Sequence, residues 1–213
     1  MKSIVIGIHL KQTDVEPVAD SMKVDDLFAS VFSVDDDRPL GDRELLLEIA
    51  AIRARLLDTA TFIAIRYGLA VRDENELAMK CAGQTKRWRE ILGAHRDEVE
   101  MTLKAAATAA TPRPDRRDFK SGAAYLRALH DAANAVDIDS DFRRGVERTL
   151  LPITTRHRWL RDSASVELAM LVRRGDLESV RAAGESLRRD HATMPFLLSG
   201  PWPLEVFADD HQQ

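Results

Sequence analysis

The apolar residues in the first half of the chain fall into short runs and into longer segments where they recur every three or four positions. The short runs are rich in β-branched side chains and predict strands over residues 2–8, 27–34 and 59–71. Residues 98–104 alternate strictly between apolar and polar, which predicts a strand with one face in water. The apolar side of that strand consists of Val99, Met101 and Leu103.

The longer segments predict two helices in this half. In residues 42–58 the apolar side chains lie four, three and four positions apart, which makes one apolar stripe. Asp42 stands at the start of this helix, where its carboxylate can accept hydrogen bonds from free backbone N–H groups. Residues 73–96 carry acidic side chains first and basic ones later, the order that the helix dipole favours. Residues 11–25 are polar and contain Pro17, so we expect a loop there that can include a helical turn.

The second half of the chain repeats this mixture of patterns. Apolar stripes predict helices over residues 120–136, 139–151 and 176–189. Continuous apolar runs predict strands over residues 165–172 and 193–199, and the first of these suits the centre of a sheet.

Small and helix-breaking residues fill positions 105–118, including a Thr-Pro-Arg-Pro run at residues 111–114. Such a composition is typical of linkers between domains. We therefore expect two domains, residues 1–110 and residues 111–213. Because strands and helices are mixed in each, the predicted class is α+β, with helices packed on one face of a mostly antiparallel sheet in each domain.

The charge of the chain is balanced, with 31 basic and 35 acidic residues and a formal net charge of −4. Residues 1–109 carry the whole of this net charge, and residues 110–213 are neutral. Neither half has the basic excess that a dedicated nucleic-acid-binding protein needs. We therefore expect no nucleic acid among the partners.

Cysteine use and hydropathy bear on the compartment of the protein. Cys81 is the single cysteine, so no intrachain disulfide is possible and a reducing compartment is expected. The apolar residues 1–8 are too short for a signal peptide, and acidic residues follow soon after them. No run approaches the ~18 apolar residues that a membrane helix needs. We therefore expect a soluble, cytoplasmic protein that does not enter a membrane.

Motifs for catalysis and metal binding are missing from the sequence. The six histidines show no His-Glu-x-x-His spacing, and we expect them at the surface. No glycine-rich nucleotide loop and no Gly-x-Ser-x-Gly elbow occurs. Cys81 lies on the apolar stripe of its helix, which favours a core residue over a nucleophile. We therefore expect no catalytic, metal or cofactor site.

Two charged clusters leave alternatives open. The acidic run at residues 35–37 can bind a hard cation, but it lacks the spaced ligands of a calcium loop, and a solvated turn is favoured. Arg156, Arg158 and Arg161 surround Trp159, a mixture that can stack nucleobases. Because the second half is neutral, a helix face or a contact with a protein partner is favoured over RNA binding there.

Two segments of the chain resemble motifs of one known family. The first is Thr-Phe-Ile-Ala-Ile-Arg-Tyr-Gly at residues 61–68, between one helix and the acidic start of the next. The second is Leu-Leu-Ser-Gly-Pro-Trp-Pro at residues 197–203, with Phe207 close behind. In this order the two motifs resemble the gas vesicle protein L/F family, and the resemblance covers residues 2–207.

The chain departs from the family pattern at both motifs. Ala64 stands where proline is usual, and Tyr67 stands where phenylalanine is usual. After the second motif, Leu204, Glu205 and Val206 stand where the family has proline, tyrosine and serine. These departures bear on whether this copy performs the usual task of the family.

The resemblance implies a non-enzymatic accessory or minor structural protein of gas vesicle assembly, associated with the vesicle. Such a protein is expected to bind the hydrophobic shell protein and other accessory proteins, without a cofactor. The resemblance also implies an α+β N-terminal domain and a C-terminal domain with a modified ferredoxin-like arrangement. The alternatives are a diverged α+β adaptor or regulatory module that acts outside vesicle formation, and an enzyme whose site the sequence does not disclose.

The end of the second motif is one candidate partner-binding surface. Trp202 stands between Pro201 and Pro203, so little conformational entropy is lost when it docks, and Phe207 follows. Trp202 can equally pack back onto its own domain as a latch, which the large area of the indole ring favours.

The strand over residues 98–104 is the second candidate surface. A shell subunit that later lines a gas space is very apolar before assembly, so a soluble partner needs an apolar groove or a strand edge to shield it. We therefore include Val99, Met101 and Leu103 among the candidate partner-binding residues.

Overall fold

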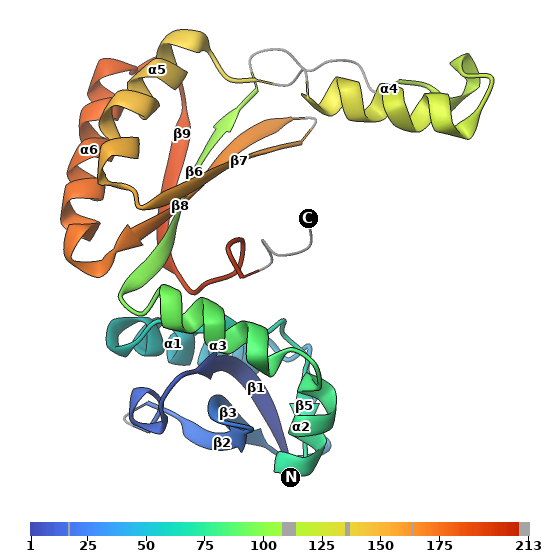
Figure 1. Cartoon of the computed structure of the whole chain (residues 1–213), viewed down its shortest axis with the longest axis vertical. Helices are drawn as coiled ribbons and strands as arrows, with labels where there is room; N and C mark the ends of the chain where they lie inside the picture. Colours follow the sequence, from blue (N-terminus) through green and yellow to red (C-terminus); the bar gives the residue numbers. More distant parts are fainter. Residues whose placement is uncertain (17, 108–113, 135–136, 163, 209–213) are drawn as a thin grey trace. The chain divides into compact units, whose positions relative to one another are not determined.

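The computed structural model describes residues 1–16, 18–107, 114–134, 137–162 and 164–208 (Figure 1). Unit 1 of the chain comprises Met1–Val99 together with Trp202–Gln213, and unit 2 comprises Glu100–Pro201. The division therefore falls earlier than the expected boundary after residue 110, because the strand that begins at Glu98 belongs mostly to the second sheet. Residues 108–113 of the expected linker lie outside the described residues.

Unit 1 is built on a five-stranded sheet. Its strands are β1 (Lys2–His9), β2 (Asp20–Val24), β3 (Leu27–Val34), β4 (Ile63–Ala64) and β5 (Ala70–Val71). They follow the order β2-β3-β1-β4, and β5 also pairs with β1. β1 runs antiparallel to β3, β4 and β5, and β2 forms an antiparallel hairpin with β3. β1 is buried along nearly its whole length, as its continuous apolar sequence predicts.

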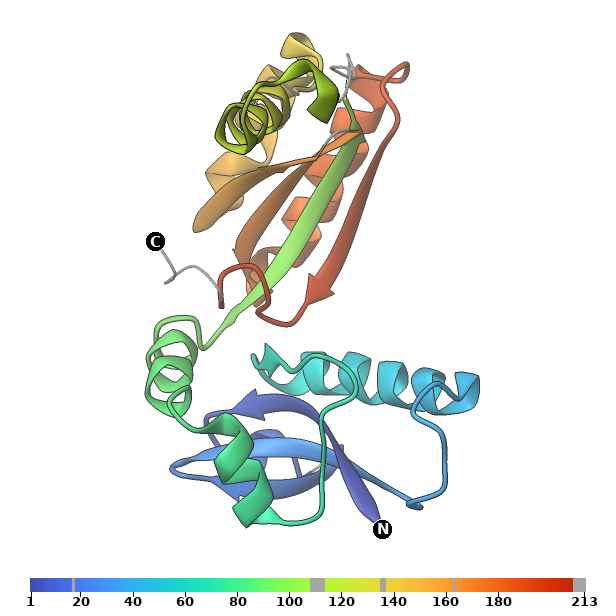
Figure 2. The same ribbon diagram turned by 90° about the vertical axis from the view of Figure 1, so that its right-hand side faces the viewer.

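The helices described in unit 1 are α1 (Arg43–Thr59), α2 (Glu74–Cys81) and α3 (Thr85–Ala94). α1 begins where the sequence predicts, because the Asp42 carboxylate accepts a hydrogen bond from the Glu44 N–H at 3.1 Å. Figure 2 shows α1 lying across one face of the sheet. The side chains that α1 buries are Leu45, Ile49, Leu56 and Leu57.

Three predictions for unit 1 are wrong in detail. The single helix expected over residues 73–96 is two helices, because Gly83 adopts a φ of +81° between them, a conformation that glycine reaches without strain. The single strand expected over residues 59–71 is two short strands, with Gly68 at positive φ between them. The segment 11–25, expected as a loop that can include a helical turn, has such a turn at Gln12–Asp14 but also contains β2.

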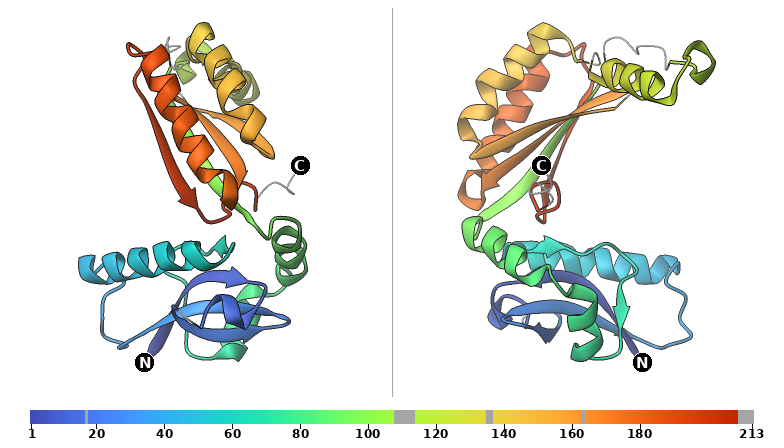
Figure 3. Two further views of the ribbon diagram at one scale, coloured as in Figure 1. Left: turned by 90° about the vertical axis from the view of Figure 1, so that its left-hand side faces the viewer. Right: turned by 45° about the vertical axis from the view of Figure 1, so that its right-hand side comes forward.

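Unit 2 is built on a four-stranded sheet with the order β7-β8-β6-β9. Its strands are β6 (Glu98–Ala106), β7 (Arg156–Arg161), β8 (Ser165–Arg173) and β9 (Phe196–Trp202), and its helices are α4 (Gly122–Asn134), α5 (Ser140–Thr149) and α6 (Leu177–Asp190). Figures 1 and 3 show α5 and α6 side by side on one face of this sheet. Antiparallel sheets combined with helices confirm the predicted α+β class, and this strand order is compatible with the expected ferredoxin-like arrangement.

The core of unit 2 lies between its sheet and the helices α5 and α6. The buried side chains of this core include Met101, Leu103, Phe142, Val146, Leu168, Met170, Val180 and Leu187. β8 is buried along its centre, as its apolar run predicts. β7 places the arginines around Trp159 on a strand, so the expectation of a helix face there is wrong.

A buried histidine and serine lie in the core of unit 1. His9 stands at the end of β1, and its Nε2 lies 3.0 Å from the Ser30 Oγ. The imidazole ring stacks on Phe62 with 5.0 Å between ring centroids. Burial lowers the pKa of His9 to about 3, because a charged ring would lose its hydration there. The expectation that all six histidines lie at the surface is therefore wrong for His9.

We predict that the protein loses stability on mild acidification because of His9. The unfolded chain binds a proton at His9 near the ordinary pKa of 6.5, whereas the folded chain does so only near 3. The free energy of unfolding therefore falls as the pH drops through this window, by about 2 kcal/mol between pH 7 and pH 5. Urea unfolding at the two pH values measures this loss.

Two variants isolate the contribution of His9. His9→Gln removes the titrating group and is expected to reduce the loss of stability between pH 7 and pH 5. His157→Gln removes a histidine at an exposed position and is expected to leave the loss unchanged. An equal pH dependence in His9→Gln and in the parent protein would contradict the prediction.

Candidate functional site

The last described residues of the chain pair with the sheet of unit 1. The Leu204 N–H donates to the Phe62 carbonyl at 2.9 Å, and the Ala64 N–H donates to the Leu204 carbonyl at 3.2 Å. The two bonds form a parallel bridge between Leu204 and Ile63 of β4. After unit 2, the chain therefore returns to the motif at residues 61–68.

Both departures from the proline pattern take part in this pairing. By the resemblance set out above, Ala64 and Leu204 each stand where the family motifs are expected to carry proline. Proline has no backbone N–H, whereas Ala64 and Leu204 each donate one across the bridge. The two departures thus supply the two donors that join the C-terminal segment to β4, a role that the motif comparison alone did not indicate.

Side-chain burial holds the same segment against unit 1. Leu204 and Phe207 are fully buried, and Ala208 is nearly so. The Arg87 guanidinium of α3 donates a hydrogen bond to the Ala208 carbonyl. Phe207, rather than Trp202, is therefore the aromatic side chain that anchors this segment.

Trp202 lies at the surface of unit 1, with 47% of its area exposed. Pro203 beside it is buried, and Pro201 is half-buried. The sequence allows a latch or a partner contact for Trp202, and this exposure favours the contact, since Leu204 and Phe207 form the latch. The partner-binding role of the segment stays a prediction.

Gly200 is required by the close approach of β9 to β6. Its φ is +124°, and a Cβ built on it would lie 2.9 Å from the Glu100 carbonyl oxygen and 2.6 Å from the Met101 sulfur. A larger residue would therefore collide with the backbone of β6 and would also be strained in its own backbone. The glycine of the Gly-Pro-Trp-Pro motif thus fixes the path of β9 before the chain returns to unit 1.

The second candidate surface, the strand over residues 98–104, is not exposed. Val99, Met101 and Leu103 are buried, and so is Glu100 on the face that was expected to be wet. β6 lies between β8 and β9 in the sheet, so it has no free edge. The expectation of an exposed strand edge is therefore wrong, because alternation along one strand does not show which neighbours pair with it.

Metal binding and thiol chemistry are both disfavoured among the described residues. In these ranges of the chain, no group of three or more His, Cys, Asp or Glu side chains is placed to hold a metal ion. Cys81 is buried, and burial together with the nearby charge of Asp25 raises the pKa of its thiol, which disfavours the nucleophilic thiolate. Within the acidic turn, the Asp36 carboxylate pairs with the N-terminal amino group at 2.8 Å.

The basic and aromatic cluster of unit 2 is engaged within its own unit. Trp159 packs against the core, and the Arg143 guanidinium lies over its ring, 4.9 Å from the centroid. Arg161 lies 3.9 Å from Asp137. The indole face next to Arg143 is therefore occupied by a side chain of the same unit and is not an open platform for a nucleobase.

None of the helices in the part of the chain that the structure describes combines the length and the apolar composition needed to cross a bilayer.

Comparison with known proteins gives one family and one fold. The sequence profile of the family described as gas vesicle synthesis protein GvpL/GvpF matches residues 11–208. No curated protein sequence matches the chain.

Two crystal structures share the fold. The gas vesicle protein GvpF from Microcystis aeruginosa has a TM-score of 0.68 and 10% sequence identity, over 98% of this chain and 99% of that chain. The gas vesicle protein GvpF from Anabaena sp. PCC7120 has a TM-score of 0.67 and 13% identity, over 98% of this chain and 96% of that chain. At these identities the likeness shows a common fold.

We predict that Phe207 and Trp202 differ sharply in their effect on stability. Phe207→Ala removes a fully buried ring and is expected to cost about 3–5 kcal/mol. Trp202→Ala removes a half-exposed ring and is expected to cost about 1–2 kcal/mol. Urea unfolding of both variants measures the difference, and equal losses would show that Trp202 shares the anchoring role.

Proposed function

The chain belongs to the gas vesicle synthesis protein GvpL/GvpF family, and we propose that it is a non-enzymatic accessory protein of gas vesicle assembly. The observation that carries the proposal is the family profile, which matches residues 11–208, nearly the whole chain. In this role the protein binds the hydrophobic shell protein and other accessory proteins of the vesicle. It acts in the cytoplasm, in association with the vesicle, and without a cofactor.

A physical argument supports this role. A shell subunit that later faces a gas space carries a large apolar surface before assembly, and that surface drives aggregation in water. A soluble partner shields such a surface with exposed apolar side chains of its own. Unit 1 offers such side chains in Leu47 and Trp202, which are 61 and 47% exposed.

Trp202 is the contact residue that we propose within the C-terminal motif. The buried Pro203 and the paired backbone of Leu204 fix its position, so little conformational entropy is lost when a partner covers the ring. Tryptophan is also enriched among the residues that dominate binding energy at interfaces. The other candidate residues have structural positions: Pro203 and Phe207 are buried, Pro201 is half-buried, and Val99, Met101 and Leu103 are buried in β6.

A pull-down of co-expressed proteins tests the proposal. The tagged protein is expressed with the major gas vesicle shell protein and the accessory proteins encoded in the same genome. We expect retention of the shell protein, reduced about fivefold or more by Trp202→Ala. Met79→Ala, at an exposed position on α2, serves as the matched control and is expected to leave retention unchanged.

The results of the pull-down test the assembly role and the Trp202 contact separately. Retention that Trp202→Ala leaves unchanged would keep the assembly role and remove Trp202 from the contact. If a folded sample retained neither the shell protein nor any accessory protein, the assembly role would be abandoned in favour of an adaptor that acts outside vesicle formation.

A further inference from the structure

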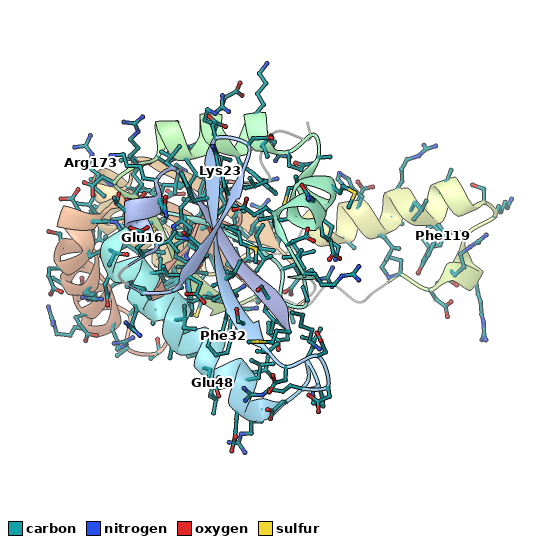
Figure 4. All side chains as sticks on the ribbon, turned by 90° about the horizontal axis from the view of Figure 1, so that it is seen from below. Glu16, Lys23, Phe32, Glu48, Phe119 and Arg173 are labelled. Carbon is teal, nitrogen blue, oxygen red and sulfur yellow. The ribbon has the colours of Figure 1, made fainter. Side chains whose placement is uncertain are left out.

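An open groove of about 590 Å³ lies in unit 1 beside α1. Its walls come from α1, from β3 and from the segment that leads into β2. Apolar side chains form much of its lining, including Val18, Val31, Phe32 and Ile52. Figure 4 labels Glu48 on α1, and Glu16 and Phe32 beside that helix. The groove therefore runs along a helix and combines apolar with charged side chains.

α1 is also apolar on residues that do not face the sheet. Four exposed residues follow one another at i, i+3, i+4 and i+7, and they are Leu47, Ala50, Ala51 and Ala54. Leu46 beside them is 41% exposed. The three alanines allow the backbone of a second helix to come close, and Leu47 gives that helix a large side chain to pack against. Ala51 also lines the groove, so the exposed stripe and the groove are continuous.

The charges around the groove are mostly negative. The charged lining residues are Glu16, Asp20, Glu48 and Arg55. Glu48 is paired with Arg38 at 3.1 Å, and Glu16 accepts a hydrogen bond from the Gln12 side chain at 2.6 Å. Asp20 forms no ion pair with any of the described residues. A ligand with positive side chains would therefore meet unneutralised carboxylate charge here.

The neighbouring strand edge does not favour an added strand. β2 is at the end of its sheet, so its outer edge is the place where an extended peptide would pair. The Lys23 N–H on that strand already donates to the Glu74 carboxylate of α2 at 2.7 Å, and α2 packs against β2. The spacing on α1 matches a helical ligand instead, since helices pack along rows of residues three and four apart.

We propose that the exposed stripe of α1 and the adjoining groove, together called the α1 surface, bind an amphipathic helix of a partner protein whose apolar face is bordered by lysine or arginine. The apolar face of that helix covers Leu47 and the alanines and enters the groove, while its cations lie near Asp20 and Glu16. The inference rests on the proposed function in one respect, that the helix belongs to a protein of gas vesicle assembly.

Two designed helical peptides test the α1 surface directly. They share one leucine and alanine face, which is bordered by lysines in one peptide and by glutamates in the other. Fluorescence anisotropy measures their binding to the full chain at fixed salt concentration. We expect the lysine peptide to bind about tenfold more tightly than the glutamate peptide.

Two matched variants locate the binding site. Ala51→Arg places a long cation in the middle of the α1 surface and is expected to weaken lysine-peptide binding about tenfold or more. Met79→Arg makes the same kind of change at an exposed position of α2 and is expected to leave binding unchanged. Both positions are exposed in helices, where arginine is well tolerated, so both variants are expected to fold.

Several results would overturn the inference. One is equal affinity of the protein for the two peptides, and another is equal peptide binding by the two variants. A third is a dimer in sedimentation that Ala51→Arg dissociates, because a second copy of the chain would then occupy the α1 surface. The shell-protein pull-down, run in parallel, keeps the two proposals apart. If the shell protein is retained but the two peptides bind equally or the two variants behave alike, only the proposed α1 surface is abandoned. If the lysine peptide binds but no vesicle protein is retained, only the proposed assembly role is abandoned.

Discussion

The backbone pairing of Leu204 with Phe62 and Ala64 is the constraint on which the organisation of this protein depends. It ties the C-terminal segment to β4, a strand in the first half of the chain. As a result unit 1 is formed from two separate stretches of sequence, and unit 2 occupies the stretch between them. The burial of Phe207 adds apolar area to the same attachment. Trp202 is left exposed next to it, where a partner can reach the ring.

Much of the fold follows from local patterns that the sequence displays. The stripe of α1, the cap at Asp42 and the apolar run of β8 each depend on neighbours in sequence, and each was predicted correctly. The break at Gly83 was missed, because a single glycine inside a helical pattern does not by itself show that the helix ends. β2 was missed because its polar residues form a strand only through pairing with β3.

The candidate site was predicted less well, because it depends on contacts between distant residues. The sequence identified the Gly-Pro-Trp-Pro motif but gave no sign that Leu204 would pair with Phe62, and it therefore favoured the largest ring, Trp202, as the latch over a partner contact. It identified Ala64 and Leu204 as separate departures from a proline pattern. The structure brings the two together as hydrogen-bond donors in one bridge, a relation that no local spacing reveals.

The proposed binding role places two surfaces on unit 1, the ring of Trp202 and the α1 surface. Both present exposed apolar side chains beside buried neighbours, which lowers the entropy lost on binding. The negative charge beside α1 adds selectivity, because an apolar helix bordered by carboxylates would be repelled there. A protein that shields an apolar subunit needs both properties, since apolar contact alone does not distinguish its partner from other apolar surfaces.

Native-state hydrogen exchange followed by NMR tests the attachment of the C-terminal segment most directly. The amides of Leu204 and Ala64 are the probes, and the amide of Ile6 in β1 serves as the reference for unit 1. If the segment completes unit 1, Leu204 and Ala64 exchange only when the unit unfolds, at a rate close to that of the reference. Exchange of both amides at the rate of an exposed loop, while the reference stays protected, would contradict the account.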